Sequence, residues 1–280
     1  LQGGAITDLD GYGIDADTSS ATLDQLRIQG LRRYQGLAGG AIGARGSTLS
    51  ITAAAIADLE AGAIYVSGGS TLELSRSALV GTSRLHTGVD CASARRCSLW
   101  ASSIVDYRSS VAANGTTEVW AADLLLSQGT FLIQESQGLR VDRLAWLGIA
   151  NPDALYLYRA AGEISDLWLD ALPQPPFGTV GLRTEGSTLS IHRARLAGAA
   201  TLMLLSRGET TLTDLELEHN AGPAPVVDEG QRPGAIMGRL GALRIERASM
   251  HELYDQAMFL VLAQEVSIRD LDVADVHHVP

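Results

Sequence analysis

Residues that could carry out acid–base chemistry recur from residue 123 onwards, at intervals of 20 to 33 residues. They alternate in sign without a break: Asp123, Arg143, Asp166, Arg193, Asp214, Arg247 and Asp270. General acid–base catalysis uses titratable groups whose pKa values the site moves apart. If successive segments stack, each Asp instead lies between two Arg, which holds it ionised. We therefore interpret the seven residues as a structural charge ladder that fixes register.

Acidic residues near the start of the sequence are candidates for calcium binding, because hard cations prefer several oxygen ligands in one turn. Asp8, Asp10, Asp15 and Asp17 lie there, with Gly11 among them. The spacing of an EF-hand loop is absent. We therefore interpret these residues as solvated turn carboxylates.

Five histidines lie in separate segments or close to residue 280: His192, His219, His251, His277 and His278. None of them forms the i, i+4 pair that a helical metal site uses, although His277 and His278 near Asp272 and Asp275 could bind a transition metal adventitiously. No serine lies in a Gly-x-Ser-x-Gly motif. We therefore predict no catalytic residues, no metal site and no cofactor, and whether the chain is an enzyme stays open.

The two cysteines, Cys91 and Cys97, flank the short polar stretch Ala-Ser-Ala-Arg-Arg. A structural zinc site needs about four nitrogen or sulfur ligands, so an isolated pair is a poor one. The spacing favours a local disulfide that closes a surface loop over residues 84–98; two free thiols or redox chemistry are the alternatives. A disulfide would place the chain in an oxidising compartment, that is, extracellular, on the cell surface or periplasmic.

An internal repeat must position these residues. Gly-Ser-Thr-Leu-Ser-Ile occurs at Gly46–Ile51 and again at Gly186–Ile191, and Gly69–Leu74 is a near copy. Around them recurs a looser pattern: apolar, any, apolar, two polar or small residues, Leu or Ala, any, apolar. We call the second apolar residue the anchor. The anchors are spaced by about 24 residues, and a degenerate first copy falls at Ile6: Leu23, Ile51, Leu74, Ala101, Ala121, Val141, Ile164, Ile191, Leu212, Ile245 and Ile268.

Each copy predicts three short strands separated by bends, which bury one row of side chains only if the copies stack. The segments are too short for amphipathic helices, and glycine and proline punctuate the turns. A leucine-rich repeat has Asn or Cys at a fixed position of each copy. The chain has only three Asn, which disfavours that fold. The sequence therefore predicts an all-β solenoid of about eleven or twelve coils that forms one domain over residues 1–280, and it leaves open whether the chain is a fragment of a longer one.

This repeat resembles that of the right-handed parallel β-helix proteins, the pectate-lyase-like superfold, over nearly the whole chain. The resemblance implies the fold and leaves the functional subfamily open, since one fold hosts many activities. Enzymes of the superfold display clustered carboxylates, or calcium beside a basic residue, on an outer face. Neither the paired Asp-Asp nor the Gly-His-Gly motif of the polygalacturonase-like members occurs.

An apolar and aromatic stripe is predicted on the outer face. Strand alternation from the anchors points five candidate binding residues outward: Trp100, Trp120, Trp168, Val105 and Leu125. Such a stripe usually marks a contact surface for a glycan or another protein. The alternatives are a covering loop, either residues 173–177 or the Cys91–Cys97 loop, or a slip in the register.

The amino-acid composition limits the classes of partner that the chain is expected to bind. Lysine is absent, so the 21 basic residues are all arginine, and 32 acidic residues give a net charge of −11. This balance disfavours nucleic acid and anionic lipid as partners, and no apolar run approaches the length that membrane insertion requires. The favoured function is a non-catalytic extracytoplasmic scaffold or adhesin-like binding module of unknown oligomeric state. A polysaccharide lyase or glycoside hydrolase is the alternative.

Overall fold

The computed structural model describes residues 1–8, 13–30, 40–60, 62–82, 86–148, 153–170, 179–220, 234–239, 241–254, 256–261 and 263–277. The described residues form strands and bends without a helix, so no helix among them could span a membrane. The strands stack in parallel as a β-solenoid of about 10 turns, which confirms the predicted fold class with slightly fewer turns than expected. The chain divides into two compact units, Leu1–Gly138 and Leu139–Pro280.

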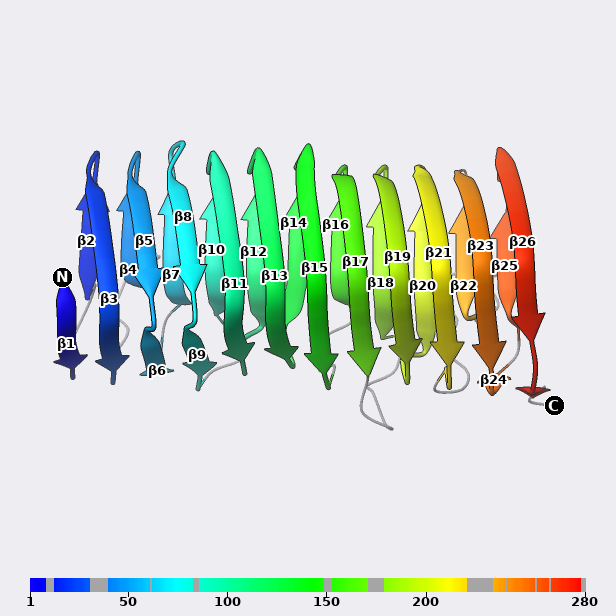
Figure 1. The fold of residues 1–280 in the computed structure, drawn as a ribbon, viewed down its shortest axis with the longest axis horizontal. Helices are drawn as coiled ribbons and strands as arrows, with labels where there is room; N and C mark the ends of the chain where they lie inside the picture. The colour runs from blue at the N-terminus through cyan, green and yellow to red at the C-terminus, as the bar shows by residue number, and fades with distance from the viewer. Residues whose placement is uncertain are drawn as a thin grey trace. The chain divides into compact units, whose positions relative to one another are not determined.

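The N-terminal unit contains two sets of parallel strands (Figure 1). The first set runs in the order β13, β11, β8, β5, β3, and β9 and β6 continue the pairing from β11 back to β3, with β1 also on β3. The second set runs in the order β2, β4, β7, β10, β12, β14. The strands are β1 Gln2–Thr7, β2 Ile14–Asp17, β3 Ser20–Gln29, β4 Gly40–Arg45, β5 Thr48–Thr52, β6 Ala55–Leu59, β7 Gly62–Ser67, β8 Thr71–Ser75, β9 Ala78–Gly81, β10 Thr87–Ala92, β11 Arg96–Val105, β12 Ser109–Asn114, β13 Glu118–Ser127 and β14 Thr130–Gln134.

The C-terminal unit repeats this arrangement. Its long strands pair in the order β15, β17, β19, β21, β23, β26, its shorter strands in the order β16, β18, β20, β22, β25, and β24 pairs with β27. The strands are β15 Gly138–Leu147, β16 Asp153–Tyr158, β17 Ala161–Asp170, β18 Val180–Glu185, β19 Thr188–Ala197, β20 Thr201–Ser206, β21 Glu209–Glu218, β22 Ile236–Arg239, β23 Ala242–His251, β24 Leu253–Tyr254, β25 Met258–Val261, β26 Glu265–Val273 and β27 Val276–His277.

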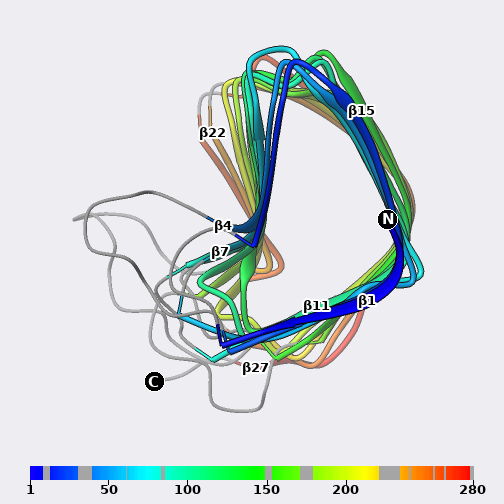
Figure 2. The ribbon, with the colours of Figure 1, turned by 90° about the vertical axis from the view of Figure 1, so that its left-hand side faces the viewer.

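A left-handed bend divides each long strand into two of the three predicted segments. In β19 the bend is Arg193, with φ of 54°. Ile191 before it and Ala194 and Leu196 after it are all buried, because the bend resets the in–out alternation. In the earlier turns the same bend separates β5 from β6 and β8 from β9. Seen end-on, β1 and β11 lie on one side of the coil and β4 and β7 on another (Figure 2).

The anchors stack as predicted within each unit. Ile51 pairs with Leu74 in the N-terminal unit, and Ile164, Ile191, Leu212 and Ile245 pair in succession in the C-terminal unit; all are buried. The last anchor, Ile268, pairs with Ile245 but is 37% exposed. Its strand β26 ends the sheet among the described residues, so only one neighbour covers it.

One anchor was assigned wrongly. The residue that pairs with both Leu74 and Ala121 is Leu99, not Ala101. Ala101 is exposed and forms the left-handed bend of its turn, with φ of 49°. Cys97-Ser-Leu99 and Leu99-Trp-Ala101 both fit the pattern of apolar, any, apolar residues, and the pairing with Leu74 selects the first. The predicted pattern therefore begins two residues late in this copy.

The Gly-Ser-Thr-Leu motif forms a corner between two faces of the coil. Gly46 adopts φ of +57°, and the hydroxyl of Ser47 behind it shares its one hydrogen between the carbonyls of Arg45 and Ala16, which lie 2.8 and 3.0 Å away. The same hydroxyl accepts the backbone N–H of Ser19 at 3.1 Å. Ser70 and Ser187 repeat this role in their own turns. A buried serine at the corner thus satisfies backbone groups that the bend leaves out of the sheets.

Candidate functional site

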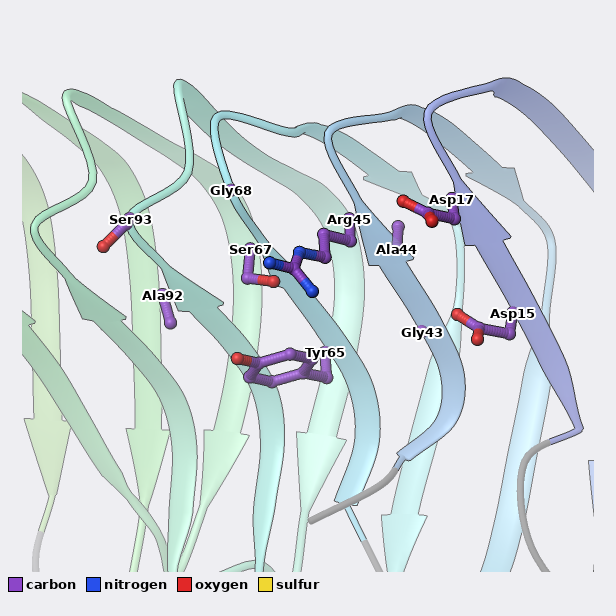
Figure 3. A pocket seen from close by; sticks show the side chains of 10 residues that line it. All are labelled: Asp15, Asp17, Gly43, Ala44, Arg45, Tyr65, Ser67, Gly68, Ala92 and Ser93. Carbon is purple, nitrogen blue, oxygen red and sulfur yellow. The ribbon is translucent and has the colours of Figure 1, made fainter. Parts of the chain in front are cut away.

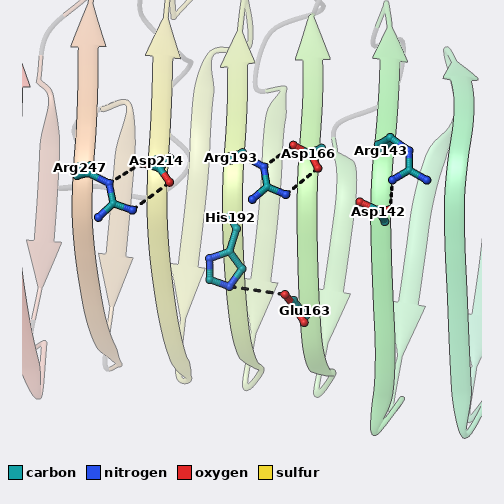
Figure 4. A network of polar contacts seen from close by, with 8 residues as sticks. All are labelled: Asp142, Arg143, Glu163, Asp166, His192, Arg193, Asp214 and Arg247. Atoms are coloured by element: carbon teal, nitrogen blue, oxygen red, sulfur yellow. Dashed lines mark hydrogen bonds and ion pairs between the residues drawn. The ribbon is translucent and has the colours of Figure 1, made fainter.

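The charged bend residues pair two by two in the C-terminal unit (Figure 4). Arg193 donates from Nε and Nη2 to the two carboxylate oxygens of Asp166 at 2.6 and 2.8 Å. Arg247 holds Asp214 in the same bidentate way at 2.6 and 3.0 Å. Arg143 also forms an ion pair with its chain neighbour Asp142. Each bonded Asp therefore engages the Arg of the following turn.

These hydrogen bonds fix the charge of the carboxylates. Hydrogen bonding from Arg193, with a smaller contribution from the charges of Arg193 and Arg143, holds the pKa of Asp166 below its ordinary value. Arg247 lowers the pKa of Asp214 in the same way. A carboxylate that is ionised and already engaged is a poor proton donor or acceptor near neutral pH. The geometry therefore favours a role in fixing the register between turns over a role in catalysis. Asp123 and Asp270 also lie at the left-handed bend of their own turns, with φ of 52° in each.

Two of the candidate tryptophans form a pair on the outer face of the N-terminal unit. Trp100 on β11 is 39% exposed and Trp120 on β13 is 45% exposed. Trp100 pairs with Ala122, and Trp120 pairs with Ser98. The indoles are therefore diagonal neighbours on adjacent strands, a separation that aromatic side chains can span.

Charged groups flank this pair. The guanidinium of Arg96 lies 4.5 Å from the ring centroid of Trp120, and its Nε donates to Glu118 Oε2 at 2.6 Å. Glu118 begins β13 two residues before Trp120. The surface thus combines two apolar ring faces with a cation and a carboxylate.

The other three candidates lie elsewhere. Trp168, 52% exposed, belongs to β17 of the C-terminal unit, with the Arg195 guanidinium 5.9 Å from its ring. Leu125 is exposed and pairs with Ser103, whereas Val105 is half-buried and pairs with Ser127. The corrected anchor at Leu99 explains the difference, because it moves Val105 two positions beyond the column of Leu125. The predicted outward residues therefore do not form one stripe.

The disulfide lies in the core and not in a surface loop. Cys91 and Cys97 are bonded, with their Cα atoms 6.4 Å apart, and both are fully buried. Cys91 belongs to β10 and Cys97 to β11, so the bond joins two faces of one coil across the bend at residues 93–95. The predicted loop over residues 84–98 is therefore wrong: most of it is strand, and residues 84 and 85 lie outside the described part.

The candidate metal ligands are dispersed. Among the described residues, no group of three or more His, Cys, Asp or Glu side chains could hold a metal ion. His192 lies 3.8 Å from Glu163, and His219 forms an ion pair with Glu252. Asp10, Gly11, His278 and the covering loop expected at residues 173–177 lie outside the described residues.

Sequence reasoning missed a groove on the other set of strands in the N-terminal unit. It has a volume of about 630 Å³ and is lined by Asp15, Asp17, Arg45, Tyr65 and Ser67, with smaller residues between them. These residues belong to β2, β4 and β7 (Figure 3). The available signal was the alternation Asp15-x-Asp17, Gly43-x-Arg45 and Tyr65-x-Ser67, which places polar side chains outward once the strands are aligned.

Comparisons of the chain with models of known families, with curated proteins and with solved structures found no match. The fold itself defines the class of protein, which is a parallel β-solenoid repeat protein. Function must therefore be argued from the surfaces of this chain.

Proposed function

We propose that this β-solenoid is a non-catalytic, extracytoplasmic binding module that holds carbohydrate on the outer face of β11 and β13. The observation that carries the proposal is the diagonal pair of exposed indoles, Trp100 and Trp120, with Arg96 stacked on the second. The buried disulfide supports an oxidising compartment. A place among the pectate-lyase-like β-helix proteins is part of the same proposal.

The physical argument is the cost of leaving two indoles in water. Exposed tryptophans gain little there, and burying each against an apolar surface removes a large area from solvent. The apolar face of a pyranose ring stacks on an indole, while its hydroxyls need donors and acceptors at the rim. Arg96 and Glu118 supply both. Because their ion pair is preformed, these side chains lose little further freedom when a ligand binds.

The experiment is a glycan array with the purified chain, followed by titration calorimetry of each glycan found. Replacing both indoles, Trp100→Ala with Trp120→Ala, removes two stacking contacts that each carry more than about 1 kcal/mol in typical binding hot spots. We therefore expect at least a tenfold loss of affinity. The far-UV circular dichroism spectrum should stay unchanged, because both side chains point outward.

Trp168→Ala is the matched control, because it removes an equally exposed indole from the C-terminal unit. It should leave the affinity unchanged. An equal loss in this control would assign the binding to the other unit, and the absence of any bound glycan would overturn the proposal. Release of reducing sugar by the unmodified chain would replace it with the hydrolase or lyase alternative.

A further inference from the structure

The groove on β2, β4 and β7 is open because small residues separate its polar side chains. In the register of these strands, Gly43 stands between Asp15 and Tyr65, and Arg45 stands between Asp17 and Ser67. The glycine leaves a hollow between a carboxylate and a phenol ring. Figure 3 shows the two carboxylates on β2 and the Arg45 and Tyr65 side chains farther along the groove.

The side chain of Arg45 packs over a second glycine. Gly68 adopts φ of +63°, and a Cβ built on it would lie 3.3 Å from Cγ and 3.9 Å from Nε of Arg45. The arginine side chain therefore lies over a site that any other residue would fill. This placement carries the guanidinium toward β7, away from the carboxylates of β2 (Figure 3).

The polar groups of the groove are available to a ligand. Among the described residues, the side chains of Asp15, Asp17, Arg45 and Tyr65 make no hydrogen bond or ion pair with one another or with any neighbour. Elsewhere on the outer faces, Arg96, Arg193 and Arg247 each hold a carboxylate. Four unpartnered groups around one groove offer two acceptors, one fixed donor set and one ring face.

The charges select the ligand. Two carboxylates against one guanidinium leave one net negative charge, and Asp15 and Asp17 lie two residues apart on one face of β2. The net negative charge and the closeness of the two carboxylates both favour a cationic ligand group at the β2 end of the groove. A calcium ion would need about six oxygen ligands, which two carboxylates do not supply. At the other end, Arg45 suits hydroxyl or ether oxygens, and Tyr65 offers a stacking face.

The dimensions require more than one sugar ring. β2 and β7 are separated by β4, so they lie about 10 Å apart at the usual strand spacing. A ligand that reaches from the carboxylates to Tyr65 must span this distance. We propose that the groove binds an oligosaccharide of amino sugars, with a protonated amine on Asp15 and Asp17 and a second ring on Tyr65 beside Arg45.

This site is separate from the tryptophan pair and does not depend on it. The groove lies on β2, β4 and β7, whereas the indoles lie on β11 and β13. The ligand also differs, because the groove requires a positive charge. The Trp100→Ala, Trp120→Ala variant is therefore the background in which the groove is tested, because it removes the other proposed carbohydrate surface.

The test uses two probes that differ only at the amine: a tetramer of β-1,4-linked glucosamine and the same tetramer fully N-acetylated. Calorimetry with the full chain, below the pKa of the amines, should show at least tenfold tighter binding of the charged tetramer. Asp15→Asn with Asp17→Asn should remove this preference. Tyr65→Ala should weaken binding several-fold, and Tyr65→Phe should retain it, because the ring face and not the hydroxyl makes the contact.

Nonspecific attraction is the main competing explanation, because the chain carries a net charge of −11. Asp270→Asn with Asp272→Asn is the matched control, since it removes two exposed carboxylates from the C-terminal unit. This control should bind the glucosamine tetramer as the unmodified chain does. Equal binding of both tetramers, an equal loss in the control, or no effect of the Asp15 and Asp17 changes in a folded variant would each overturn the proposal.

Discussion

The buried disulfide can be replaced by the residues that the neighbouring turn uses at the same positions. Cys91 pairs with Val66 and Ala113, and Cys97 pairs with Leu72 and Val119. The turns on either side thus close the same corner with apolar side chains. The variant Cys91→Ala with Cys97→Val copies the following turn and should keep the fold.

The free energy of unfolding that is lost with the disulfide depends on the length of the loop that the bond closes. The two cysteines are six residues apart in sequence, and the chain-entropy relation gives roughly 2.4 kcal/mol for a loop of about seven residues. Apolar side chains that fill the corner recover part of this stabilisation. We therefore expect the free energy of unfolding to fall by no more than about 2 kcal/mol.

Urea unfolding, followed by circular dichroism, measures this change. Cys91→Ser with Cys97→Ser is the control, because it also removes the bond but buries two hydroxyls. It should cost roughly 1–3 kcal/mol more than the apolar variant unless the hydroxyls find partners. A loss above about 4 kcal/mol in the apolar variant, or a lost β-sheet spectrum, would refute the reasoning and make the bond essential.

Three further predictions concern the C-terminal unit. Because Arg193 lowers the pKa of Asp166, their pair stabilises the fold above the unfolded pKa of about 3.9 and loses its effect as the pH falls through the lower folded value. Asp166→Asn should therefore reduce Tm by at most a few degrees at pH 7, and this difference in Tm should shrink as the pH falls below about 3.9. Ile191→Ala should cost about 2–5 kcal/mol in urea unfolding, because it leaves a cavity in the buried anchor row; a loss below 1 kcal/mol would contradict that packing. Gly162→Ala would place its Cβ on the carbonyl oxygen of Leu139 and should lower the free energy of unfolding by more than about 2 kcal/mol. The control Gly69→Ala meets no atom within 4 Å and should lower it by about 1 kcal/mol, for its φ of +77° alone. Equal losses would show that the clash at residue 162 is relieved.

The fold could be predicted because it depends on a repeated apolar pattern. The anchors Ile164, Ile191 and Leu212 recur at similar spacing, and only stacking buries them together. The one misplaced anchor shows the limit of the pattern. Around residue 99 the pattern fits both Cys97-Ser-Leu99 and Leu99-Trp-Ala101, and only the pairing of Leu99 with Leu74 decides between them.

The surfaces were harder to predict because they depend on register between turns. Trp100 and Trp120 were correctly expected outward, but a shift of two residues decides which side chains are their neighbours. The groove was missed for a related reason. Asp15, Arg45 and Tyr65 are separated by 20 to 30 residues, and no local motif joins them. They come together only when β2, β4 and β7 align, and Gly43 then leaves the space between them.

The residues at the left-handed bend differ between the two units, and so do the polar contacts that link one turn to the next there. A left-handed φ is unfavourable for every residue except glycine, and Asp tolerates it better than Arg does. In the N-terminal unit the bends include Gln25, Ala53 and Arg76, which form no alternating series. There, the serine that follows the bend links one turn to the next: the hydroxyl of Ser77 accepts the N–H of Ala54 at 3.0 Å, and the hydroxyl of Ser102 accepts that of Ser77 at 3.1 Å.

In the C-terminal unit the residue after the bend is Leu or Ala, so no hydroxyl is available at that position. The bidentate Arg–Asp pairs then link successive turns from outside the coil. The Asp166–Arg193 and Asp214–Arg247 pairs thus add polar links between turns to the packing of the apolar anchors.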